Sequence, residues 1–282
     1  MLGLGKPFFL LVSVSIFFVI GAGNRVFRFE RACMRGLVHA QPNLHLAKLE
    51  WPKVKEDYLN ISYIGHSVFF VETPGGASLA TDYNGIHTPP YVPDIVTMNP
   101  SRPTHFDDCP NPAIKFPLVG SDPDGSVAKV DIKYKDMRVY NVPTNMYKLN
   151  NTLQSDSSVF IMESAGICIA HLGHLHHALG KNQLHLLGHI DILMVLIDGF
   201  STMSHEEALK VIAEINPKVI LPMHYQFLGS TQEFTELAAT RYPIKELKLP
   251  IFQVSRRTLP KETEVLYLLS HYGDTLPSAV AP

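Results

Sequence analysis

Histidine is the residue type that stands out in this chain, with 14 copies in 282 residues. Four of them, His171, His174, His176 and His177, directly follow the apolar run at residues 167–170, which has the pattern of a buried β-strand. Neutral imidazole is a common zinc ligand, and the end of a strand is a rigid place to hold it. Histidines in such a loop can also cap a helix or stay solvated. The segment therefore predicts part of a metal site, with a structural role as the alternative.

Two other strand ends also carry histidine. His224 follows the apolar run at residues 218–221, and His105, with Asp107 and Asp108 nearby, follows the run at residues 94–98. Sandwich and barrel folds build one site from ligands at several strand ends. We therefore expect the loops with His105, His171 and His224 to converge in one cleft.

Short β-rich segments must position these loops. Strand patterns occur at residues 60–65, 67–72, 77–82 and 94–98, with a hairpin turn at 73–76. Two further pairs are expected at 128–134 with 137–142 and at 158–163 with 166–171. Residues 100–125 are rich in proline and are expected to form a long loop.

Helices enter in the second half of the chain. Ser204 and Glu207 have the spacing of a capping box before an apolar helical run that ends at Pro217, and Ser230 with Glu233 repeats the pattern. The first of these helices lies between the strand patterns at 192–197 and 218–221, which is a β-α-β arrangement. Two β-rich parts closed by helices predict an α/β (α+β) fold, a sandwich of two sheets with helices outside.

Composition limits the class of protein. The hydrophobic content of 46% is ample for a core and excludes disorder as the main state. Lys and Arg total 24 against 26 Asp and Glu, and no basic block is present, so a nucleic-acid partner is not supported. We expect a small-molecule substrate. The predicted organisation is one domain at residues 43–275 and a disordered tail at 276–282.

The N-terminal segment, residues 1–41, has the pattern of a targeting sequence. Residues 7–23 are free of charge and follow the single Lys6, as in a secretory signal. Cleavage after Ala40 would release an exported protein, periplasmic or secreted. An uncleaved membrane anchor is the alternative, because a run of this length barely spans a bilayer. Arg25, Arg28 and further arginines after the run would then hold the C-terminal part in the cytoplasm.

The order of five segments resembles the metallo-β-lactamase fold. Its most similar branch contains hydrolases like ascorbate-6-phosphate lactonase and N-acylphosphatidylethanolamine phospholipase D. The strand and His-containing loop at 94–105 is one of the five, and the other four are Tyr63-Ile-Gly-His-Ser67, Ala80-Thr-Asp82, Ala170-His-Leu-Gly173 and Leu221-Pro-Met-His-Tyr225. The resemblance implies a four-layer αββα sandwich. It also implies one or two metal ions that polarise the substrate and supply a hydroxide nucleophile.

The family's metal ligands are only partly retained. His105 and His224 match family ligands, but Arg102 stands where the family has a second histidine of the motif His-x-His-x-Asp-His. Asn145, or its neighbour Met146, replaces a further histidine. His174 replaces the carboxylate that bridges two metals in the family. A dinuclear zinc site is therefore not expected.

One zinc ion is the cofactor that the remaining ligands predict. His105, His174 and His224 give the ligand count of a catalytic zinc that keeps an open position for water, and His171 is a further candidate ligand. Asp198, which ends the strand pattern at 192–197, and His177 are candidates for moving protons.

Three residues are candidates for contacting the substrate. These are Arg102, which could grip a phosphate or carboxylate bidentately, His66 and Asn145. Each also has a structural reading, as a surface, core or loop residue. Two functions follow. One is a metal-dependent hydrolase of an ester, lactone or phosphodiester, and the alternative is a non-catalytic family member that binds a small anion.

Overall fold

The computed structural model describes residues 52–100, 103–122, 126, 128–147, 153–225, 228–249 and 251–270. Arg102, the N-terminal segment 1–41 and the tail 276–282 lie outside these residues. The expectations for them therefore stay predictions.

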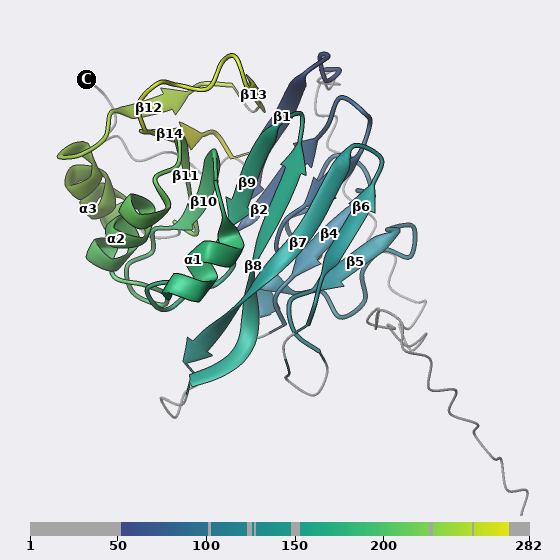
Figure 1. Ribbon diagram of the computed structural model, residues 1–282, viewed down its shortest axis with the longest axis horizontal. Helices are drawn as coiled ribbons and strands as arrows, with labels where there is room; N and C mark the ends of the chain where they lie inside the picture. The colour runs from purple at the N-terminus through teal and green to yellow at the C-terminus, as the bar shows by residue number, and fades with distance from the viewer. Residues whose placement is uncertain are drawn as a thin grey trace, which may run out of the picture.

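Two β-sheets form the body of the protein (Figure 1). The first has six strands in the order β13-β1-β2-β3-β4-β5. Strands β1, β2 and β13 pair antiparallel, whereas β3, β4 and β5 pair parallel. Their bounds are β1 Tyr58–Gly65, β2 Val68–Glu72, β3 Ser78–Ala80, β4 Ile95–Met98, β5 Phe116–Val119 and β13 Ile251–Ser255.

The second sheet has eight strands in the order β12-β14-β11-β10-β9-β8-β7-β6. Its half from β9 to β12 is parallel, and the half from β6 to β9 is antiparallel. The bounds are β6 Asp131–Tyr134, β7 Met137–Tyr147, β8 Leu153–Ser164, β9 Ile167–His171, β10 Ile192–Leu196, β11 Val219–Met223, β12 Ile244–Leu247 and β14 Glu264–Leu268.

The two sheets pack face to face, and in Figure 1 the teal strands β7 and β8 lie in front of the blue strands β2 and β4. One core cluster joins Phe69 of β2 to Phe160 of β8, and both side chains are fully buried. Every residue of β10 is buried, as expected for a central parallel strand covered on both faces. The predicted α/β fold of two sheets is confirmed.

Three α-helices in the described part of the chain contact the eight-stranded sheet: α1 Lys181–Leu187 against β7, α2 His205–Ile215 against β10 and α3 Leu228–Ala239 against β12. Helix α2 has the predicted cap, because the backbone N–H of Glu207 donates to the Ser204 hydroxyl. Helix α3 begins before Ser230. The hydroxyl of Ser230 donates instead to the carbonyls of Ile197 and Asp198, so it does not act as a helix cap.

The long loop expected at residues 100–125 is interrupted. It contains the one-turn 3₁₀ helix η1 Pro103–His105 and strand β5. Strand β5 is an edge strand on the parallel side of the first sheet, where it pairs with β4. Pro117 is tolerated there because an edge strand leaves one row of its backbone groups without a partner strand.

Candidate metal centre

Three buried histidines meet at one edge of the sandwich. His66, His105 and His224 each offer a ring nitrogen, and these three atoms all lie within 4.8 Å of one another. Ligand atoms around a tetrahedral zinc with bonds of about 2.0–2.1 Å would be about 3.4 Å apart. The group is therefore close to metal-binding spacing, and small side-chain movements would complete it.

Each of these histidines comes from a different loop. His66 directly follows β1, His224 directly follows β11, and His105 ends η1 after β4. The rings of His66 and His224 have centroids 4.2 Å apart, and those of His105 and His224 5.3 Å apart. The predicted convergence of the loops that carry His105 and His224 is thus confirmed.

The backbone at the site is held in an uncommon conformation. His66, Asp82 and His224 have φ angles of 54°, 40° and 61°. Left-handed backbone is costly for residues other than glycine and persists only where surrounding contacts enforce it. Here the carbonyl of His66 accepts hydrogen bonds from the Tyr63 hydroxyl and the His224 N–H, both at 2.8 Å. These bonds fix two of the three histidines relative to each other.

His105 is oriented by a buried carboxylate. Its Nδ1 lies 2.5 Å from Oδ2 of Asp82, and both side chains are fully buried. Its Nε2 is buried and has no hydrogen-bond partner among the described residues. Burial acts to raise the pKa of Asp82, but His171, His105 and Asn99 outweigh it and hold the pKa below its usual range. An ionised carboxylate that accepts a hydrogen bond from Nδ1 leaves Nε2 free to bind a metal. Metal-binding histidines in proteins usually have such a carboxylate or carbonyl partner.

Asp198 lies behind His224. Its Oδ1 is 3.3 Å from Nδ1 of His224, and its carboxylate accepts hydrogen bonds from Ser201 and Thr202. Burial acts to raise the pKa of Asp198, but these contacts outweigh it and lower the pKa far below its usual range. An aspartate held this firmly as an anion is poorly suited to taking up protons, and Nδ1 of His224 makes no hydrogen bond to it or to another described residue.

His66 is the residue whose role differs most from the expectation. Burial, together with the neighbouring His224, His105 and His87, lowers the pKa of His66 to about 3, so its imidazole is neutral at pH 7. The sequence pattern predicts it instead as a residue that contacts the substrate. The available signal was its position at a strand end after Gly65, the same kind of position that singled out the other histidines.

His174, expected as the third ligand, lies beside the group of three. Its ring meets those of His105 and His224 edge-on, with centroids 4.8 Å and 5.4 Å away. Its Nδ1 is 2.7 Å from Nε2 of His176. His174 therefore borders the centre. His66, and not His174, is the third histidine of the group.

The structure gives two other histidines structural contacts, which corrects the roles expected for them. His171 is fully buried, with its Nε2 2.9 Å from the Ser67 carbonyl and its Nδ1 accepting from the Gly173 N–H. Because both ring nitrogens are engaged, it is not available as a ligand.

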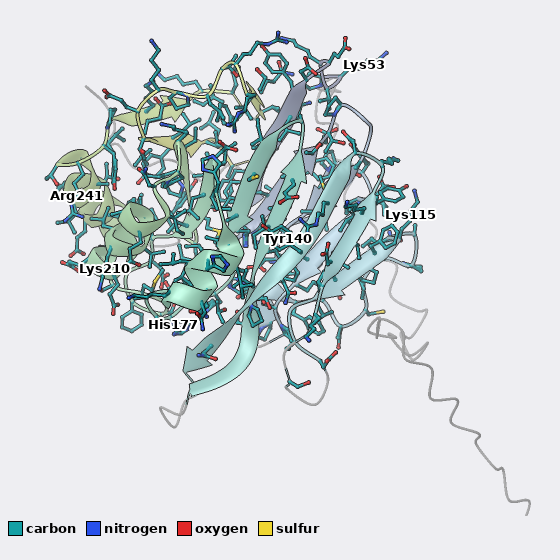
Figure 2. The ribbon with its side chains drawn as sticks, in the orientation of Figure 1. Lys53, Lys115, Tyr140, His177, Lys210 and Arg241 are labelled. Carbon is teal, nitrogen blue, oxygen red and sulfur yellow. The ribbon has the colours of Figure 1, made fainter. Side chains whose placement is uncertain are left out.

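His177 is tied to the backbone in the same way. Its Nε2 accepts from the Asn145 N–H at 3.1 Å, and its Nδ1 lies 2.7 Å from the Ala178 carbonyl. Figure 2 shows His177 at the edge of the molecule beside α1. These contacts hold its loop against β7, so His177 is not placed to move protons at the centre.

A family model described as the beta-lactamase superfamily domain matches residues 60–224, which is more than half of the chain. The chain belongs to the beta-lactamase superfamily. The match spans all three histidines of the centre.

This superfamily member is similar to proteins from several microorganisms. It is 25% identical over 191 residues to a UPF0173 protein of Pyrococcus abyssi, covering 61% of this chain and 85% of the relative. A Thermotoga maritima structure, named as a candidate zinc-dependent hydrolase of the metallo-beta-lactamase superfamily, has a TM-score of 0.56 and 24% identity, covering 74% of this chain and 98% of that one. Igni18, a metallo hydrolase of Ignicoccus hospitalis, has a TM-score of 0.50 and 17% identity, covering 70% and 99%. Both structures share the fold.

Proposed function

We propose that this protein is a metal-dependent hydrolase that holds one divalent ion, most suitably zinc, through His66, His105 and His224. The observation that carries the proposal is the buried group of three ring nitrogens within 4.8 Å. The buried Nε2 of His105, which has no hydrogen-bond partner in the described part of the chain, adds to it. A polar atom buried without a partner is costly, and binding a metal ion would remove that cost.

Different residues would hold the ion, orient its ligands and bind the substrate. When bound, the ion would supply a Lewis acid and a water of lowered pKa. His66, His105 and His224 would hold it, and Asp82 and Asp198 would orient His105 and His224 from behind. His174 borders the group and stays a candidate for a further ligand. Arg102 and Asn145 stay candidates for gripping an anionic part of the substrate.

The ligand chemistry supports a proposed substrate class. Three neutral imidazoles leave the charge of the ion uncompensated, which favours a polarised carbonyl or phosphoryl group. We therefore propose an ester, a lactone or a phosphodiester as substrate, as in the lactonase-like and phospholipase D-like branch that the sequence resembles.

The test is metal analysis of protein purified without chelator. We expect about one zinc per chain, slow hydrolysis of p-nitrophenyl acetate or bis(p-nitrophenyl) phosphate, loss of both with chelator and recovery when zinc is added. One zinc without hydrolysis of either compound would favour the alternative, a non-catalytic protein that binds a small anion. A protein that contains no metal and binds none when zinc is added would contradict the proposal.

We also propose that the protein is exported or anchored to a membrane by residues 7–23. Residues 7–23 carry no charged side chain and follow Lys6, which is the pattern of a secretory signal or a membrane anchor. No helix in the described part of the chain is long and apolar enough to cross a bilayer, and residues 7–23 lie outside that part.

Mass spectrometry of the native protein tests this localisation. We expect either an N-terminus near Gln41 or a full-length chain in the membrane fraction. Full-length protein free in the cytoplasm would contradict export and anchoring.

A further inference from the structure

Asn99 lies directly after β4 and is fully buried between the two sheets. Its Nδ2 donates to Oδ1 of Asp82 at 3.0 Å and to the Ser158 carbonyl at 3.3 Å. Its Oδ1 accepts from the Ser158 N–H at 2.9 Å and from the Ser157 hydroxyl at 3.4 Å. Both ends of one amide are thus bonded across the sandwich.

We propose that Asn99 is a positioning residue for the metal centre, which fixes Asp82 and through it the ring of His105 to the second sheet. The inference rests on the proposed metal site. Asn99 itself touches none of the three ligand rings in any contact described above. Its effect would pass through the 3.0 Å bond to Asp82 and the 2.5 Å contact of Asp82 with His105.

The two carboxylate oxygens of Asp82 have separate partners. Oδ1 takes the amide of Asn99, which leaves Oδ2 directed at Nδ1 of His105. The backbone N–H of Asn99 also donates to the His105 carbonyl at 3.0 Å. The same residue therefore restrains both the backbone of His105 and the carboxylate that orients its ring.

Two glycines border the amide of Asn99. A Cβ atom on Gly120 would lie 2.5 Å from Oδ1 of Asn99, and one on Gly173 would lie 2.7 Å from its Nδ2. Two glycines thus provide the space for the amide. Gly173 directly precedes His174, so Asn99 also contacts the loop that borders the centre.

Only an amide meets these requirements. Asp82 and the Ser158 carbonyl need donors, whereas the Ser158 N–H needs an acceptor, and Asn supplies both. An ionised aspartate at this position would lose both donors of the amide and place a second carboxylate beside Asp82. Both changes weaken the hold on His105.

The test compares Asn99→Asp with Asn141→Asp. Asn141 is a matched control, because its amide bonds Val130, Ala128 and the Ser158 hydroxyl but not Asp82. We expect Asn99→Asp to bind zinc about 10–100-fold more weakly, the usual cost of losing a partner behind a metal ligand, and to change the visible spectrum of the Co²⁺-loaded protein. Asn141→Asp should change neither.

Two further measurements separate positioning from a general structural role. In an Asp82→Asn background the effect of the Asn99 change on zinc affinity should largely disappear, because both act on the same ring. Asn99→Ser, which is smaller and uncharged, provides a second variant if Asn99→Asp does not fold. Unchanged zinc affinity in a folded Asn99 variant, or equal losses in Asn141→Asp, would overturn the inference.

The positioning role can also be measured without metal. Nitrogen NMR of the His105 ring should show the proton on Nδ1 in the wild type and a mixture of tautomers in the Asn99 variants. If the wild type binds no metal, the proposed function fails. The tautomer of His105 still tests whether Asn99 sets the orientation of the His105 ring. The same tautomer in the wild type and in the Asn99 variants would overturn the positioning role.

Discussion

A His105→Gln variant is expected to lose more than about 100-fold in zinc affinity, and all zinc-dependent hydrolysis with it. Removing the hydrogen-bond partner of a metal ligand lowers metal affinity about 10–100-fold, and removing the ligand itself should lower the affinity further. Glutamine is preferred to alanine because its amide can still donate to Asp82. Removing one partner of a buried pair costs about 3–5 kcal/mol when the other charge is left alone. Zinc titration against a chromophoric chelator measures the affinity.

A matched control is His185→Gln, an exposed histidine on α1. It should bind zinc and hydrolyse test esters like the wild type, and with chelator present both variants should still unfold cooperatively. Wild-type zinc affinity in a folded His105→Gln protein would rule out the proposed centre. Equal losses in the two variants would point to binding at surface histidines.

The sequence was sufficient to predict two of the three strand ends that carry the histidine group. An apolar run that ends in histidine places that residue at a strand end, and sandwich folds build one site from ligands at several strand ends. His105 and His224 were found in this way. The identity of the third ligand could not be predicted, because it depends on the turn after β1, where His66 has a φ of 54°.

His171 shows the opposite limitation. Its residue type and position fit a ligand as well as those of His224 do. The contact that excludes it, from Nε2 to the Ser67 carbonyl, joins residues 104 positions apart in the sequence. Such pairings depend on how the two sheets pack, which no local pattern encodes. The same holds for Asn99, which no motif marked and whose partners lie on both sheets.

At the level of the fold, the long buried strands and the α2 cap were predictable from local pattern. Strand β5 was not, because Phe116–Val119 contains a proline and lies in a proline-rich stretch. It forms where β4 offers a free edge. Helix α3 shows that a capping-box pattern does not by itself set the start of a helix, since Ser230 bonds carbonyls after β10 instead.

The largest effect on stability is expected from Gly173→Ala. Gly173 has a φ of 61°, and a Cβ there would lie 2.7 Å from both the Ser158 carbonyl oxygen and Nδ2 of Asn99. Left-handed backbone costs an alanine about 1–2 kcal/mol, and overpacking against atoms that cannot move costs about 1–3 kcal/mol. We expect the free energy of unfolding to fall by about 2–5 kcal/mol.

Gly166→Ala isolates the backbone contribution. Gly166 has a φ of 69°, and a Cβ there would have no atom within 4 Å, so only about 1–2 kcal/mol should be lost. Urea unfolding of both variants measures the difference. Because relief of the Gly173 clash requires Asn99 or β8 to move, Gly173→Ala should also weaken zinc binding, whereas Gly166→Ala should not. Equal destabilisation by the two changes, with zinc affinity intact in both, would show that the interior around Asn99 is not close-packed and that Asn99 does not hold His105 in place.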